Sequence, residues 1–191
     1  MSSPLTIVLI RDLKRAGQLL IMFIVAYFLS LEAPEVAWFP NNMRTSSVLE
    51  SAYASDFTLK DTDGKDVKLS DLASRGPVLL VFWTACCNKG PDALAYASEI
   101  YKEKKDKGLG VLAVNLDGTG RHGFIRELVA TYKWEFPVLL DPTRSVATQY
   151  RVLAVPSFII VNKDMELTYY GLGFNDDQKK AVRSELDKLL K

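Results

Sequence analysis

Three apolar runs, each bounded by turn or helix signals, constrain the fold of this chain most strongly. They are PVLLVFW at residues 77–83, GVLAVNLD at 110–117 and PSFIIV at 156–161. Near-continuous apolar runs of this length are typical of strands that are buried on both faces of a sheet. Helical patterns follow the runs, over residues 91–107, 124–134 and 176–190. The alternation predicts an α/β domain with a partly parallel central sheet flanked by helices.

Shorter segments complete this predicted domain, which spans residues 55–191. DFTLKD and KDVKLS flank Asp63-Gly64, and this pattern predicts an N-terminal hairpin extension. Ser70 is expected to cap a short helix after the hairpin. FPVLLD and SVATQYRV predict a short strand and a short helix. ELTYYGLG, at 166–173, is close enough to the strand at 156–161 for an antiparallel hairpin, so the sheet should be mixed. In the helix over 124–134, Phe124, Leu128 and Tyr132 have helical spacing and are expected to form its apolar face.

The first forty residues differ in composition from the rest. Residues 16–31 carry no charge, three basic residues precede them, and two acidic residues follow. A spanning helix needs about 20 apolar residues, which this run approaches. No small-residue cleavage pattern follows at the usual place, so we expect a retained anchor over 1–31 rather than a cleaved signal peptide. A buried core helix is the alternative. The basic flank predicts a cytoplasmic N-terminus, with the linker at 32–54 and the domain on the other side of the membrane.

The net charge indicates no nucleic-acid partner, and the motifs of the sequence indicate no bound cofactor. Net charge is +1, with 24 basic and 23 acidic residues, so no basic excess points to nucleic acid. GTGRHG at 118–123 matches the dinucleotide fingerprint G-x-G-x-x-G. However, Asp117 directly precedes the first glycine, where a pyrophosphate would meet a carboxylate, so we interpret the segment as a loop that enters a helix. The only histidine, His122, has no second ligand beside it in the sequence, and we expect no metal site.

The only two cysteines, Cys86 and Cys87, are adjacent and lie between the first buried run and the helix at 91–107. The free N–H groups and the dipole at a helix start favour an anion, so a thiol placed there should have a lowered pKa. Lys89 would add to this effect and Asp92 would oppose it. We therefore predict Cys87 as a nucleophile. For Cys86 we favour a packing role, because free cysteine is among the most buried residue types.

A second sulfur at a suitable distance is missing. The residue three positions after Cys87 is Gly90, so no resolving thiol lies one helical turn away. Consecutive Cα atoms lie about 3.8 Å apart, whereas disulfides usually join Cα atoms about 4.4–6.8 Å apart. A Cys86–Cys87 bond would thus be strained and easily reduced.

With these motifs in view, residues 55–190 resemble the thioredoxin-like domains of the TlpA/ResA type. Members of that group are membrane-tethered thiol-disulfide oxidoreductases that face an extracytoplasmic space. The likeness runs through SDFTLKDTDGKDVKLSDL, FWTACCNKG, FPVLLDPTRSVATQYRV and VPSFIIVNKDMEL. It implies a thioredoxin-like fold, an attacking Cys87, and a cis-proline at Pro156 that faces the active site. It also implies substrate contacts at Trp83, Lys89, Val155 and Pro156.

The departures from the family pattern fall at the active centre. Gly90 replaces the resolving cysteine, Cys86 replaces a tryptophan, and Ala93 and Ala95 stand where a glutamate and a proline are common. We therefore expect a membrane-tethered, monothiol-type oxidoreductase that acts through Cys87, with Cys86 as a second candidate. Its expected partners are protein or small-molecule disulfides and a thiol reductant. The expected location is the periplasmic side of a membrane.

Two alternatives stay open at this point. One is a redox-inactive binding or scaffold module, because loss of the resolving thiol is what drift away from catalysis would look like. The other is a peroxiredoxin-like peroxidase, because Thr84 and Cys87 match the second half of the motif P-x-x-x-T-x-x-C. Leu80 occupies the proline position of that motif, which is therefore incomplete.

Overall fold

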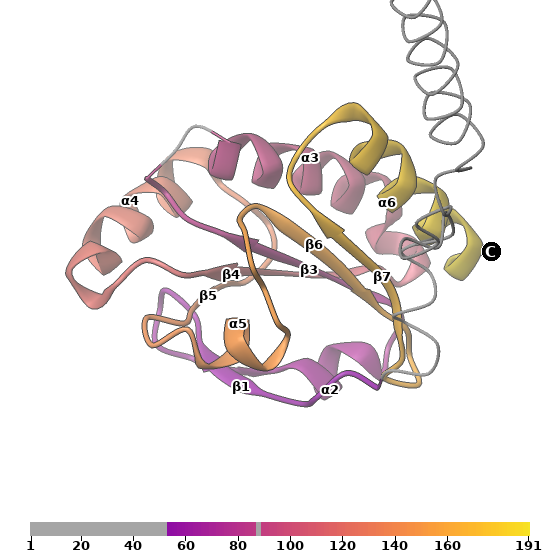
Figure 1. Cartoon of the computed structure of the whole chain (residues 1–191), viewed down its shortest axis with the longest axis horizontal. Coiled ribbons are helices and arrows are strands. Elements are labelled where there is room, and N and C mark those ends of the chain that lie inside the picture. Colours follow the sequence, from indigo (N-terminus) through magenta and orange to yellow (C-terminus); the bar gives the residue numbers. More distant parts are fainter. Residues whose placement is uncertain (1–52, 87–88) are drawn as a thin grey trace, which may run out of the picture. The chain divides into compact units, whose positions relative to one another are not determined.

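A five-stranded mixed sheet forms the centre of the computed structural model, which describes residues 53–86 and 89–191 (Figure 1). The strand order is β5-β4-β3-β6-β7. β3 (Val78–Trp83), β4 (Gly110–Asn115) and β5 (Val138–Leu140) are parallel. β6 (Ser157–Val161) is antiparallel to β3, and β7 (Leu167–Leu172) is antiparallel to β6. The predicted mixed sheet is thus confirmed.

Helices cover both faces of this sheet (Figure 1). α3 (Lys89–Lys104), α4 (His122–Tyr132) and α6 (Asp176–Leu189) contribute to the core on one face. α2 (Leu69–Ala73), α5 (Ser145–Gln149) and the predicted hairpin of β1 (Thr58–Lys60) and β2 (Asp66–Lys68) cover the other. Single 3₁₀ turns, η2 (Lys105–Lys107) and η3 (Thr119–Arg121), join the larger elements. All six residues of β3 are buried, because successive side chains point to opposite faces and both faces are covered.

One local prediction was wrong, and a second was wrong in part, since only Leu128 of the three residues expected on the apolar face of α4 packs on the core. Ser70 does not cap α2: the carboxylate of Asp56 accepts a hydrogen bond from the Ser70 backbone N–H at 3.0 Å. In α4, Phe124 and Tyr132 are 47% and 51% exposed, and Ile125 is the buried residue. The helix is rotated so that Ile125, with Leu128 and Val129 beside it, packs on the core. Spacing alone allowed either set, because both repeat at three or four residues.

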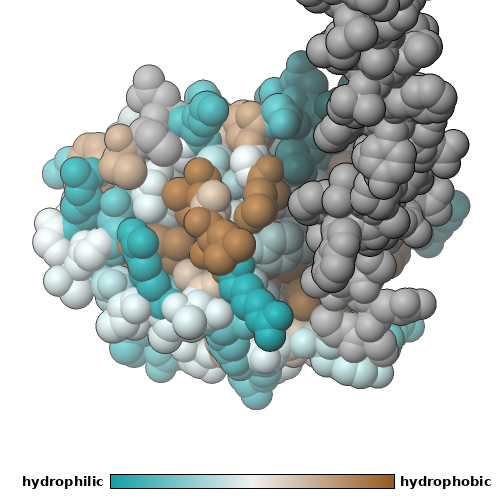
Figure 2. All heavy atoms as spheres, in the orientation of Figure 1, coloured by the Kyte–Doolittle hydropathy of each residue, from teal (hydrophilic) through white to brown (hydrophobic). Residues whose placement is uncertain are grey.

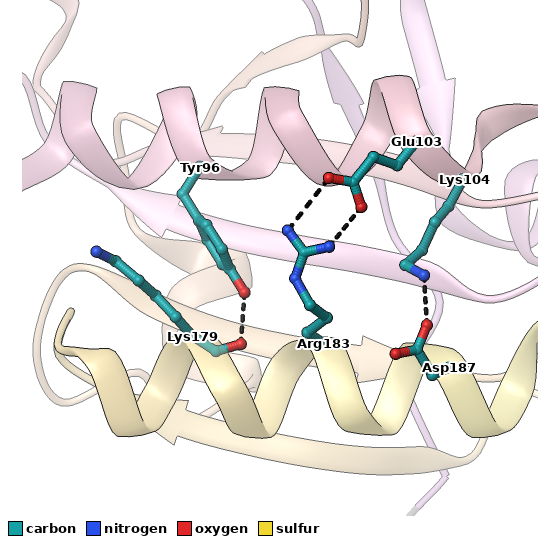
Figure 3. A network of polar contacts seen from close by, with 6 residues as sticks. All are labelled: Tyr96, Glu103, Lys104, Lys179, Arg183 and Asp187. Carbon is teal, nitrogen blue, oxygen red and sulfur yellow. Dashed lines mark hydrogen bonds and ion pairs between the residues drawn. The ribbon is translucent and has the colours of Figure 1, made fainter.

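α3 and α6 are joined by a row of polar contacts (Figure 3). The Tyr96 hydroxyl donates to the Lys179 carbonyl, Arg183 pairs with Glu103, and Lys104 pairs with Asp187. The hydrogen bond from Arg183 lowers the pKa of Glu103, and the hydrogen bond from Lys104 lowers the pKa of Asp187. These contacts hold α3, from its middle to its C-terminal end, against the last helix.

The first described residues, Tyr53 and Ala54, already pair with the segment between β6 and β7. Tyr53 forms an antiparallel bridge with Glu166, and the Ala54 N–H donates to the Met165 carbonyl at 2.6 Å. The last two residues of the predicted linker at 32–54 therefore belong to the domain. Within residues 53–86 and 89–191, no helix is long and apolar enough to cross a membrane. The predicted anchor at 1–31 lies outside the described residues.

Candidate active site

The candidate site is the turn that leaves β3, which begins with Thr84, Ala85 and Cys86. Thr84 is buried, at 5% exposure, and Cys86 is exposed. The Cys86 Sγ lies 3.2 Å from the Thr84 Oγ1. The expectation that Cys86 packs in the core is thus wrong, because the chain has already left the sheet and turned toward solvent at this position. Cys87 and Asn88 lie outside the described residues.

The start of α3 closes tightly on this turn. Lys89 is the first residue of α3 and is exposed, while Gly90, the second, is buried. A Cβ atom added at Gly90 would lie 2.1 Å from the Thr84 carbonyl oxygen and 3.2 Å from Cε3 of Trp83. Such a contact is far inside van der Waals distance, so this backbone accepts only glycine here. The position where the TlpA/ResA type carries its resolving cysteine has no room for a side chain.

Trp83 lies below the turn and is fully buried. Its ring packs edge-on against Trp134, with ring centroids 5.7 Å apart. As the last residue of β3, it points to the face that α3 covers. The structure therefore does not bring Trp83 to a surface where it could contact substrate, and its role here is to pack beneath the turn.

The loop before β6 lies beside the same turn. The Val155–Pro156 peptide is cis, as the resemblance implied. Phe82 pairs with Ser157, and one further step in this antiparallel register brings Pro156 opposite Trp83. Pro156 is buried and its carbonyl accepts the Gly173 N–H at 2.8 Å, whereas Val155 is half-buried.

Apolar surface adjoins this loop. Leu153, two residues before Val155, is 85% exposed. Figure 2 shows hydrophobic atoms gathered near the middle of the face on which the loop into β6 runs in Figure 1. The loop before β6 thus adjoins the end of β3, from which the turn departs.

A carboxylate that sequence reasoning did not connect with the site holds the turn from the neighbouring strand. Asp117 follows β4 and is only 8% exposed. Its Oδ2 accepts the Ala85 N–H at 2.7 Å and the Asn115 Nδ2–H at 2.8 Å. The Asp117 N–H in turn donates to the Asn115 Oδ1 at 3.1 Å. The only hint in the sequence was the presence of two polar residues, Asn115 and Asp117, at the end of the apolar run at 110–117.

Packing does not require glycine at any of the three glycine positions of GTGRHG. A Cβ atom at Gly118, Gly120 or Gly123 would meet nothing within 4 Å. In a dinucleotide site the glycines permit close approach of backbone or ligand, so the geometry supports the interpretation as an ordinary loop into α4. Among the described residues, no group of three or more His, Cys, Asp or Glu side chains is placed to hold a metal ion.

The sheet order, the thiol turn between β3 and α3, and the cis-proline before β6 define a thioredoxin-fold protein of the α/β class. The AhpC/TSA family model matches residues 51–170, more than half of the chain. The chain belongs to the AhpC/TSA family.

Curated proteins that are similar to this chain include thiol-disulfide oxidoreductases named ResA. That of Bacillus subtilis (strain 168) is 34% identical over 120 residues, which cover 62% of this chain and 64% of the relative, slightly less than two thirds of its length. That of a Bacillus cereus strain is 28% identical over 71% of this chain and 76% of the relative. The resemblance to the ResA type is thus confirmed.

Solved structures agree. A putative thiol:disulfide interchange protein DsbE from Chlorobium tepidum matches with a TM-score of 0.66 at 28% identity, covering 73% of this chain and 96% of that one. The exposed lipoprotein thioredoxin Etrx1 of Streptococcus pneumoniae matches with a TM-score of 0.60 at 29% identity, covering 71% and 100%.

Proposed function

We propose that the protein is a thiol-disulfide oxidoreductase that works with one attacking thiol, Cys87. The observation that carries the proposal is the contact at the start of α3. Gly90 closes against the Thr84 carbonyl where a resolving cysteine would stand, yet a cysteine is retained just before the helix. The names of the ResA relatives support the reaction class.

The proposed reaction is an exchange without net oxidation. The Cys87 thiolate attacks one sulfur of a substrate disulfide, forms a mixed disulfide with it, and releases the other substrate sulfur as a thiolate that takes up a proton. The thiolate of an external thiol such as glutathione then attacks the substrate sulfur of the mixed disulfide. This second step regenerates the Cys87 thiolate and leaves the external thiol bonded to the substrate. In the alternative second step, the Cys86 thiolate attacks the Cys87 sulfur of the mixed disulfide and releases the substrate as a thiolate that takes up a proton. The resulting Cys86–Cys87 disulfide must then be reduced by two equivalents of an external thiol.

Features around the turn support a polypeptide substrate. Lys89 is an exposed cation at the first residue of α3, and the helix start itself favours a thiolate. Beside the turn, Val155 and Pro156 would offer backbone to an extended substrate chain. Leu153 adds exposed apolar surface that an unfolded segment could cover.

We further propose that residues 1–31 anchor the protein in a membrane, with the N-terminus in the cytoplasm and the domain on the extracytoplasmic, periplasmic side. The support is the uncharged run at 16–31 with basic residues before it and acidic residues after it. The intact chain should fractionate with membranes, and a chain that lacks residues 1–31 should be released as a folded soluble domain. An unprocessed full-length chain in the soluble fraction would contradict the anchor.

Alkylation of each cysteine as a function of pH, mapped by mass spectrometry, tests the enzyme proposal. We expect a pKa for Cys87 below the ordinary value of about 8.5. Glutathione-dependent turnover should survive Cys86→Ser and disappear in Cys87→Ser. A Cys87 thiol with an ordinary pKa, or one that does not react, would favour the scaffold alternative. Peroxide consumption that requires Cys87 would favour the peroxidase.

A further inference from the structure

We infer that Asp117 is a positioning residue for the thiol turn, acting through its hydrogen bond to the Ala85 backbone N–H. The inference rests on the proposed function for its catalytic consequence, although the contact itself does not. Ala85 directly precedes the two cysteines, so its orientation sets the direction in which the chain enters the cysteine pair.

The geometry makes this contact a fixed one. β3 and β4 are parallel neighbours with Trp83 opposite Asn115, and the Leu116 N–H donates to the Trp83 carbonyl at 2.9 Å. Beyond this last ladder bond the turn leaves the sheet. The Asp117 carboxylate then takes the Ala85 N–H at 2.7 Å and extends the connection between the two strands by one further bond.

Asn115 orients that carboxylate. It is fully buried, and its side chain donates to the Asp117 Oδ2 while accepting the Asp117 N–H. Two buried polar groups thus hold each other, and one oxygen is directed at the turn. Buried hydrogen bonds of this kind restrict a side chain to one orientation. A site supported by such side chains holds its reactive atom in a defined position.

Asp141 provides a matched comparison within the same sheet. It directly follows β5, whereas Asp117 is the second residue after β4. Asp141 is fully buried, and its carboxylate also accepts backbone N–H groups, those of Ser145 and Ala147, each at 2.9 Å. Those bonds begin α5, whereas the Asp117 bond holds the thiol turn. Loss of either carboxylate leaves buried donors unsatisfied, but only loss of Asp117 should change thiol chemistry.

The test uses the full-length chain with Asp117→Ala, Asp117→Asn and Asp141→Ala, compared well below their unfolding temperatures. Asparagine can place its Oδ1 where the carboxylate Oδ2 lies, so Asp117→Asn keeps both hydrogen bonds and removes the charge. A glutathionylated peptide serves as the disulfide probe. We expect kcat to fall about tenfold or more in Asp117→Ala, as misplacement of a reacting group allows, with a smaller change in KM. Asp117→Asn should stay within about threefold of wild type, and Asp141→Ala should lose stability but keep its turnover.

Amide hydrogen exchange at Ala85 reads the contact without any activity. The Ala85 N–H should be protected in the wild type and in Asp117→Asn, and should exchange rapidly in Asp117→Ala. Rapid exchange of Ala85 in the wild type would overturn the inference even if no variant folds. Equal loss of turnover in Asp117→Ala and Asp141→Ala, or an Asp117→Asn variant as slow as Asp117→Ala, would also overturn it. A wild type that protects Ala85 but does not react with the probe would instead refute the proposed function.

Discussion

The loop that follows β3 and the loop that follows β4 leave the same edge of the sheet, because the two strands are parallel neighbours. Each leads into a helix whose second residue is glycine, Gly90 in α3 and Gly123 in α4. A Cβ atom at Gly90 would lie 2.1 Å from a backbone carbonyl, whereas one at Gly123 would meet nothing within 4 Å.

Glycines in a recognisable sequence spacing are therefore not the same as positions where the backbone has room only for glycine. The β4 loop carries three glycines in the spacing of a nucleotide-binding motif, and none of them is needed for close packing. The β3 loop leads to a single glycine, Gly90, which stands in the sequence where a resolving cysteine would be expected. Its close contact with the Thr84 carbonyl leaves no room for any other residue. At Gly90, where a resolving cysteine would stand, the Thr84 carbonyl occupies the space that its side chain would need.

The largest effect should come from substituting the two glycines in parallel. Gly90→Ala should destabilise the domain by about 1–3 kcal/mol, because the added methyl group overpacks against backbone that has little freedom to move. Gly123→Ala, at the same helix position, should be neutral or stabilising by up to about 1 kcal/mol, because alanine is the better helix former. Free energies of unfolding from denaturant titrations measure both. Similar values for the two variants would remove the distinction between the loops.

Restoring the missing thiol should fail for the same reason. Gly90→Cys recreates the C-x-x-C spacing with Cys87, but its Cβ would meet the Thr84 carbonyl as that of alanine does. We expect a loss of stability at least as large as in Gly90→Ala and no intramolecular disulfide at that spacing, as judged by thiol counting and peptide mapping under oxidising glutathione. A stable disulfide together with faster turnover would show that the backbone opens more easily than the contact implies.

The smallest effect is expected at the far end of α3, where ion pairs with the exposed carboxylates of Glu103 and Asp187 replace the backbone contact. The pKa values of Glu103 and Asp187 lie below their ordinary values of 4.5 and 3.8. A lowered folded-state pKa means that these groups stabilise the fold above the ordinary values and lose that contribution as pH falls through the folded ones. The free energy of unfolding, measured at falling pH, should decrease modestly, and Asp187→Asn should remove part of this pH dependence. High salt should weaken the contribution of both ion pairs. Cysteine alkylation rates at neutral pH should be unchanged by Asp187→Asn, and a changed rate would argue against separate roles for the two ends of α3.

Most of the fold could be predicted from the sequence, because buried strands and turn residues leave local patterns. PVLLVFW is apolar throughout, and PSFIIV is apolar except for Ser157, since both faces of the sheet are covered. Asp63-Gly64 marked the hairpin. The face of α4 could not be read, because Phe124 and Ile125 start equally good apolar stripes and only packing distinguishes them. Three features of the site could not be predicted: the exposure of Cys86, the lack of space at Gly90, and the hydrogen bond from Ala85 to Asp117. They depend on how segments distant in the sequence pack together, and the local sequence of one segment does not specify this.

Intact-mass spectrometry and peptide mapping after reaction with excess oxidised glutathione show whether this turn works with a single thiol, Cys87. We expect one glutathione adduct per chain, located on Cys87, that persists until an external thiol is added and is absent in Cys87→Ser. An adduct on Cys86 instead, or the loss of two hydrogens through an internal Cys86–Cys87 disulfide, would contradict this expectation.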